Sequence, residues 1–247
     1  QMSTRNISST FPTLLLILAS NLAFAESPPQ AWQRIYDAQG IQVDELWQED
    51  KTLPTFRGQT IIESDPWSIL AILQDTARSH EWVHRCMISR QIERHGLTNY
   101  IIYNRTDAPW PFEDRDVVVH SRVSIPDNSN EILISIQSTT HSEAKEVKGV
   151  VRMPSLKGHY RLKMLSPSVT WIEYQIDAHP GGRLPRWLAR MATKDLPFKT
   201  LEGLRSRVDE MSQSQEYQAT AAQFLALYLE KSKPKQEDAS VVNIATQ

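Results

Sequence analysis

The stretch APWPFEDRDVVVHSRV, residues 108–123, joins a turn rich in proline and aromatic residues to a strand of alternating character. Successive strand side chains point to opposite faces, so Arg115 shares its face with Val117 and Val119. Asp116 points to the other face. We therefore expect Arg115 to face the apolar interior, where an unpaired guanidinium is costly. Two interpretations stay open: an anchor for a ligand head group deep in a cavity, and an internal ion pair that fixes the sheet.

Segments of strand character continue on both sides of this stretch. Each is a short run rich in β-branched and aromatic residues, and turn residues such as Gly96 separate neighbouring runs. Successive runs of this length predict an antiparallel meander. The expected strands lie near residues 41–47 and at 55–63, 87–94, 97–105, 115–125, 131–139, 160–165 and 169–176.

Two helices complete the pattern. Asp65 and Pro66 form a helix start, as N-cap and first helical residue, and this helix is expected to end near Val83. A long second helix is expected from about residue 183 to 211, with a kink at Pro197.

The fold class that follows is α+β. Such a sheet must bury one face, and the helix of residues 183–211 is the element long enough to cover it. The strands carry more apolar surface than one helix fills. We therefore expect a curved antiparallel sheet wrapped around the long C-terminal helix, with an internal hydrophobic cavity. A simply well-packed core is the alternative.

The first 25 residues have the features of a secretory signal peptide. Arg5 precedes an apolar run at residues 11–19, and residues 23–25 (AFA) fit the small-residue cleavage pattern. Cleavage near Ala25 would place the mature protein in the periplasm or outside the cell. A retained N-terminal anchor is the alternative.

The mature chain is expected to form one ligand-binding domain, residues 26–212, followed by a segment at residues 213–247. The beginning of that segment is amphipathic, and its end is polar and expected to be disordered. The amphipathic part either docks on the domain's own surface or contacts a membrane beside its lysines.

The charge balance gives no sign of a nucleic-acid partner. The chain carries 27 Lys and Arg against 29 Asp and Glu, so no general field attracts polyanions. Cys86 is the only cysteine, which excludes an internal disulfide framework and suggests a small core residue. We expect a monomer without a cofactor.

Four stretches resemble, in the same order, landmarks of the START (StAR-related lipid-transfer) domain family: residues 108–123, 151–162, 176–189 and 196–205. The similarity spans roughly residues 32–208. This resemblance implies the helix-grip fold (START or Bet v 1-like) and a tunnel for one hydrophobic ligand, such as a lipid or sterol. It also implies binding or transfer without covalent chemistry.

Phosphatidylcholine-specific members of the family resemble this chain at Trp82 and Arg115. The aromatic walls that enclose choline in those members fall here at Asn104 and Val117, so a quaternary ammonium would lack cation–π partners. The arginine that holds phosphate in those members is one residue out of register with Arg78. The head group of the ligand therefore stays open.

The resemblance and the strand faces together give a set of candidate lipid-binding residues. The turn at residues 109–112 is the candidate for a mobile apolar gate that makes transient contact with a membrane surface. The candidates for the cavity wall and gate are Arg78, Trp82, Tyr103, Trp110, Phe112, Arg115, Val117, Ile134, Tyr174, Trp187 and Met191.

A rival signal is HEWVH at residues 80–84, which matches H-E-x-x-H. That spacing places two imidazoles on one helix face for zinc, here His80 and His84, with Glu81 to activate water. A third ligand is not evident on a second helix, and the sequence from Met87 onward has strand character. A non-catalytic binding protein is favoured, with a zinc-dependent metallohydrolase as the alternative.

Overall fold

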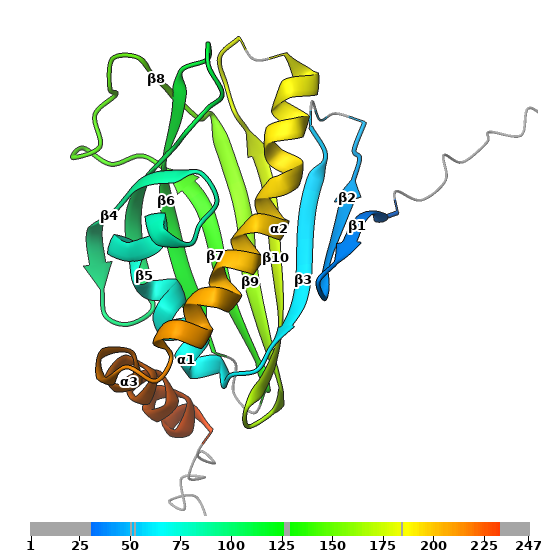
Figure 1. The fold of residues 1–247 in the computed structure, drawn as a ribbon. Coiled ribbons are helices and arrows are strands. Elements are labelled where there is room, and N and C mark those ends of the chain that lie inside the picture. Colours follow the sequence, from blue (N-terminus) through cyan, green and yellow to red (C-terminus); the bar gives the residue numbers. More distant parts are fainter. Residues whose placement is uncertain (1–30, 50, 52, 126–128, 184, 233–247) are drawn as a thin grey trace, which may run out of the picture.

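The computed structural model in Figure 1 describes residues 31–49, 51, 53–125, 129–183 and 185–232. The expected signal peptide, the end of the C-terminal segment and the side chain of Met191 lie outside the described part. Within that part, the helices are too short or too polar to cross a membrane.

One large sheet forms the framework of the domain. The strand order is β1-β2-β3-β10-β9-β7-β6-β5-β4, with neighbours antiparallel, and β8 pairs with β6 in parallel. The strands are β1 (Gln33–Ala38), β2 (Ile41–Leu46), β3 (Thr55–Ile62), β4 (Cys86–His95), β5 (Asn99–Thr106), β6 (Asp114–Ser124), β7 (Glu131–Thr139), β8 (Val150–Arg152), β9 (Ser155–Ser166) and β10 (Val169–His179).

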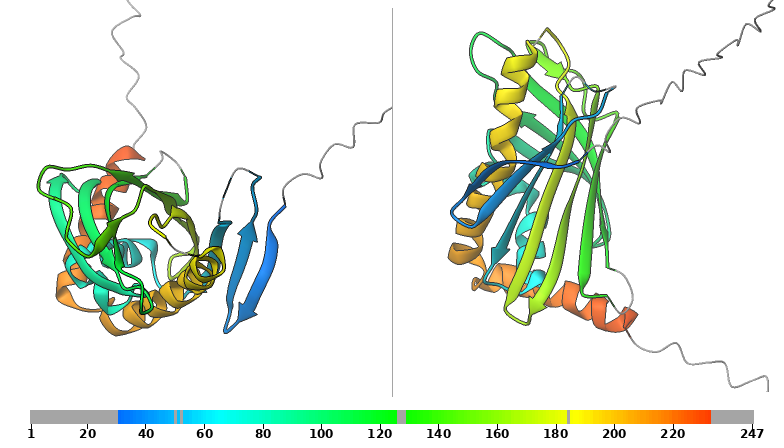
Figure 2. Two further views of the ribbon diagram at one scale, coloured as in Figure 1. Left: turned by 90° about the horizontal axis from the view of Figure 1, so that it is seen from above. Right: turned by 90° about the vertical axis from the view of Figure 1, so that its right-hand side faces the viewer.

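The expected meander is confirmed, with two additions. The segment around Ile35 forms β1, and the three-residue β8 lies in a stretch for which no strand was predicted. Seen from above in Figure 2, the sheet curls around the interior, and α2 (Arg186–Met211) runs along the open side. This is the predicted α+β architecture of a curved sheet around a long C-terminal helix.

The helix that starts at Asp65 is shorter than predicted. The Asp65 carboxylate accepts hydrogen bonds from the backbone of Trp67 and Ser68, as expected of an N-cap, and α1 covers Pro66–Gln74. The expectation of a helix to Val83 is wrong, because Asp75 ends α1 and its carboxylate accepts from the backbone N–H of Arg78. The chain continues as a 3-10 helix, η1 (Thr76–Glu81).

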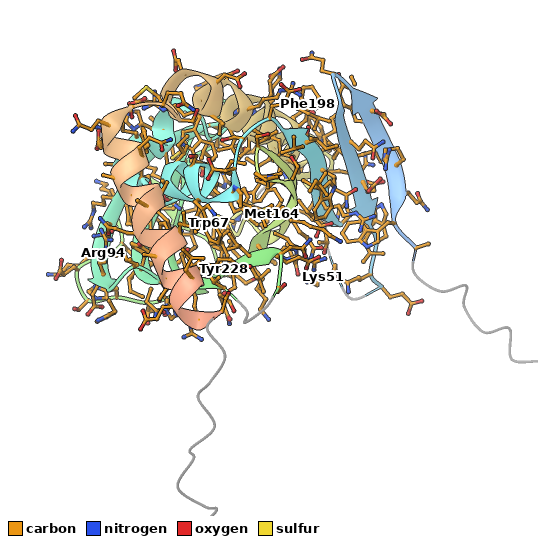
Figure 3. The ribbon with its side chains drawn as sticks, turned by 90° about the horizontal axis from the view of Figure 1, so that it is seen from below. Lys51, Trp67, Arg94, Met164, Phe198 and Tyr228 are labelled. Carbon is orange, nitrogen blue, oxygen red and sulfur yellow. The ribbon has the colours of Figure 1, made fainter. Side chains whose placement is uncertain are left out.

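The amphipathic C-terminal segment forms α3 (Gln215–Lys231) and packs against α1. Phe224 is fully buried, and the Tyr217 hydroxyl donates to Asp75 at 2.6 Å. The rings of Trp67 and Tyr228 lie 5.0 Å apart between the two helices. Figure 3 labels both residues in the view from below. The structure therefore shows docking on the domain's own surface.

A glycine lets α2 approach the end of η1 closely. A Cβ atom at Gly203 would lie 2.3 Å from the carbonyl oxygen of Trp82. Beside it, Leu201 and Leu204 are fully buried in the core. The position of Trp82 therefore depends on a backbone contact that only glycine permits.

Replacing Gly203 by alanine should reverse the usual effect of this substitution. Glycine to alanine inside a helix normally stabilises by about 0.5–1 kcal/mol. Here the added methyl group meets backbone, so we expect the free energy of unfolding to fall by about 1–3 kcal/mol. Urea unfolding measures it, with the exposed α2 substitution Ser206→Ala as a control that should change little. A stabilised Gly203→Ala protein would contradict the contact.

Candidate ligand-binding cavity

A cavity of about 240 Å³ lies between the inner face of the sheet and the segment that contains η1. Its β6 wall consists of Arg115, Val117, Val119 and Ser121, which alternate with residues of the other face. Ile134 of β7 extends the apolar wall. The wall is completed chiefly by Leu73, Trp82, Val83, Cys86, Ile102, Asn104, Ile136, Met153, Leu156, Tyr160, Tyr174, Ile176 and Leu196.

Five predicted candidates line this cavity: Trp82, Arg115, Val117, Ile134 and Tyr174. Four of them lie on strands and face the cavity because strand side chains alternate between the two faces of the sheet. The fifth, Trp82, directly follows the end of η1. Their contact with a ligand stays a prediction.

Two stacked tyrosines form part of the wall. The rings of Tyr160 on β9 and Tyr174 on β10 face each other across the strand pair, with centroids 4.4 Å apart and planes inclined by 10°. Burial raises the pKa of both phenols, so both stay neutral at physiological pH. Tyr160 was not among the sequence candidates, because the pairing of these rings depends on a strand register that a single sequence does not give.

Arg115 is buried, with 7 % of its surface exposed. Its Nη1 donates to the backbone oxygen of Glu113, whereas its Nε has no hydrogen-bond partner. Burial lowers the pKa of this guanidinium. Its Nη2 is 3.7 Å from the position that a Cβ of Gly182 would take, beneath the connection from β10 to α2. Arg115 therefore lies at the loop end of the cavity, and it faces the interior as expected.

The ion pair at this point of the sheet involves the neighbouring residue, on the other face of β6. Arg152 of β8 holds Asp116 with two hydrogen bonds of 2.7 and 3.0 Å. Among the described residues, no carboxylate lies within ion-pairing distance of Arg115. The sheet is thus fixed at this point by the neighbouring residue, and Arg115 is left facing the cavity.

Tyr103 does not line the cavity. It lies on β5 between Ile102 and Asn104, which do, and strand alternation turns its ring to the outer face. There it packs with Val118 and Ala144. Its placement in the cavity is a wrong expectation that the alternation itself would have corrected.

Arg78 also lies outside the cavity wall. Its guanidinium pairs with Asp75 at 2.6 Å and with Glu216 of α3 at 3.1 Å. The reason is its place on the outer side of η1, where α3 packs. Arg78 therefore ties η1 to α3 and does not reach a ligand in the cavity.

The gate candidates lie near the loop end. The Trp110 side chain is 92 % exposed, Phe112 is half-buried, and neither is part of the cavity wall, although Ala108 and Pro109 of the same loop are. Trp187, at the beginning of α2, is 68 % exposed. In Figure 1 the β5–β6 loop and the beginning of α2 lie at the same end of the molecule.

The HEWVH segment lacks the geometry of a zinc helix. The 3-10 helix η1 ends at Glu81, so His80 and His84 do not share a continuous α-helical face. Glu81 pairs with Arg207 of α2 at 2.8 Å, and the backbone N–H of His84 donates to Thr200. In the part of the chain that the structure describes, no group of three His, Cys, Asp or Glu residues is arranged to hold a metal ion.

The START domain model matches residues 25–214. An uncharacterized protein of Pseudomonas aeruginosa is 31% identical over 179 residues, which cover 72% of this chain and 87% of that protein. The phosphatidylcholine transfer protein of Bos taurus is 24% identical over 168 residues, 67% of this chain and 78% of that protein.

Solved structures agree with this assignment. A STAR-related lipid transfer protein fragment from Xanthomonas axonopodis has a TM-score of 0.66 at 29% identity, and the match covers 72% of this chain and 98% of the fragment. Human STARD10 has a TM-score of 0.66 at 20% identity, with 82% of each chain covered. The curled sheet, the long helix and the apolar cavity define a helix-grip protein built to enclose a hydrophobic molecule. The chain belongs to the START domain family, which is a family of lipid-binding proteins.

The single cysteine gives a direct probe of the cavity. Burial raises the pKa of Cys86 to about 11, so the reactive thiolate is scarce at pH 8. Alkylation by iodoacetamide at pH 8 should be roughly two orders of magnitude slower than for a free thiol, and should accelerate as the pH rises towards 11. The time course by mass spectrometry measures it, and the urea-unfolded protein is the control. A native rate equal to the unfolded rate would contradict the burial.

Proposed function

We propose that this protein carries one hydrophobic molecule in its cavity and transfers it between membranes without catalysis, in the periplasm or outside the cell. The observation that carries the proposal is the apolar cavity beneath Trp82 and the β6 wall, in a member of a lipid-binding family. The names of its relatives, a phosphatidylcholine transfer protein and a STAR-related lipid transfer protein, support transfer as the activity. The apolar run at residues 11–19 supports export.

The arrangement of side chains also supports a binding role. The polar groups of the cavity wall include His84, Asp107 and several hydroxyls. Among the described residues, no hydrogen bond joins a nucleophile of the wall to a base, and Ser79 and Cys86 donate to backbone oxygens. The cavity's thiol at Cys86 is held protonated by burial. Glu81, the base required by the hydrolase alternative, is engaged by Arg207.

Native mass spectrometry of the protein, purified from an exporting host without detergent or added metal, tests the proposal. We expect a complex with one lipid-sized adduct that dissociates intact, and a polypeptide mass that lacks residues 1–25. A stoichiometric zinc adduct on an otherwise empty protein would contradict the carrier function and favour the hydrolase alternative. A full-length polypeptide mass would overturn the proposed export.

Trp110 should act in transfer rather than in storage. Its indole is exposed beside the cavity's loop end and can enter a bilayer surface. Burial of about 60 Å² of this ring at about 25 cal/mol per Å² gives about 1.5 kcal/mol, or roughly tenfold in rate. Trp110→Ala should slow lipid transfer between vesicles by about that factor and leave the amount of bound lipid unchanged.

The matched control is Leu165→Ala, which removes an exposed apolar side chain from the opposite end of the molecule. It should transfer lipid at the unmodified rate. If both variants slow transfer equally, the proposed membrane contact of the β5–β6 loop is wrong.

A further inference from the structure

We infer that the ligand is a single-chain amphiphile whose anionic head group binds Arg115 at the loop end of the cavity. This inference rests on the proposed carrier function and specifies the chemistry of its ligand. A carboxylate or a phosphate monoanion would satisfy the site, and the test below separates the two.

Among the described residues at the loop end, Arg115 is a buried cation without an ion pair. Arg85 pairs with Asp107 at 3.2 Å, and Arg105 pairs with Asp114 at 2.6 Å. The third pair is Arg152 with Asp116, on the outer face of β6. The remaining neighbour, Glu113, offers its backbone oxygen to Arg115, and its side chain forms no ion pair among the described residues. None of these carboxylates lies within ion-pairing distance of Arg115, although the charges of Glu113 and Asp114 act on it from farther away and raise the pKa of the guanidinium against the larger effect of burial.

A second unsatisfied polar group lies beside Arg115. On β5, Thr106 pairs with Arg115 and Asn104 pairs with Val117, which makes Asn104 the diagonal neighbour of Arg115 on the same face. The Asn104 Oδ1 is buried and, like the Arg115 Nε, has no hydrogen-bond partner. Buried polar groups are nearly always paired in proteins. The Arg115 Nε is a donor and can bind the oxygens of a carboxylate or phosphate group, whereas the Asn104 Oδ1 is an acceptor and calls for a donor on the ligand, such as a hydroxyl next to the head group.

The shape of the cavity limits the rest of the ligand to one chain. The cavity wall includes every second residue of β6 from Arg115 to Ser121. These residues span six steps of roughly 3.3 Å each, which gives the cavity a length of about 20 Å. Its volume of about 240 Å³ is below the range of roughly 300–1,000 Å³ that is usual for pockets of drug-sized ligands. A long and narrow space beyond the head group suits one extended hydrocarbon chain. Two acyl chains or a rigid sterol would force its walls farther apart than one chain does.

The test compares ligands that differ in one property. Ligand-free protein is titrated with palmitate, palmitoyl-lysophosphatidylglycerol, hexadecanol, dipalmitoylphosphatidylglycerol and cholesterol, and binding is measured by calorimetry. We expect palmitate or the lysolipid to bind at least about tenfold more tightly than hexadecanol, because only the anions pair with Arg115. The tighter of the two identifies the head group as carboxylate or phosphate. Equal affinity for hexadecanol, or tighter binding of the two-chain lipid, overturns the inference.

Arg115→Leu should remove the preference for the anion. Palmitate should then bind no better than hexadecanol, whose affinity should not change, and Arg115→Lys should restore part of the preference. Arg122→Leu is the matched control, since Arg122 lies on β6 but on the exposed outer face. It should bind all ligands as the unmodified protein does.

Folding can be separated from binding in these variants. Replacing a buried, incompletely paired guanidinium by leucine is often neutral or stabilising, so the ligand-free Arg115→Leu protein should melt no lower than the unmodified protein. A much lower melting temperature would make Arg115 a structural residue and overturn the inference. If the protein binds only cholesterol or the two-chain lipid, the proposed carrier function still holds, but the inference of a single-chain ligand is wrong. If the protein binds none of the five compounds, the proposed carrier function itself is wrong.

Discussion

The curled sheet has an apolar inner face that must be covered, and one helix is too narrow to cover it. α2 packs along β3 and β10, where Phe198 and Leu201 complete a dense core. The strands β4 to β7 curl beyond the reach of that helix, and η1 approaches them from the interior. The apolar side chains of β6 and β7 that neither helix covers then line a space instead of a core. The cavity thus follows from the mismatch between a wide sheet and a single covering helix.

The same mismatch between sheet and helix affects the pairing of polar groups in the domain. Where strands are covered or reach solvent, their charges are paired, as Asp116 with Arg152 and Glu45 with Arg190. Among the described residues, five buried side-chain atoms have no hydrogen-bond partner, and two of them, on Arg115 and Asn104, lie in the cavity wall. Burial of unpaired polar groups costs stability, so a folded domain retains them most readily where another molecule supplies the partner.

The sequence predicted those features that depend on local periodicity. Alternation along β6 gave the faces of Arg115 and Val117 correctly, and the Asp65 cap gave the start of α1. It did not predict the end of α1, because Asp75 competes for the backbone through its own side chain. The stacked pair of Tyr160 with Tyr174 and the pairing of Asp116 were also missed. Both depend on the register between distant segments, which periodicity does not encode.

The helix α3 lies beyond residue 214, where the match to the family model ends. It covers the end of the molecule opposite the β5–β6 loop, as Figure 1 shows. The space behind it is filled by fully buried side chains such as Ile72, Leu162 and Phe224, none of which reaches the cavity wall. Packed side chains therefore close the cavity at the α3 end. In the proposed carrier, the ligand would enter and leave elsewhere, and the loop end beside Pro109 is the nearest part of the wall to solvent-exposed Trp110.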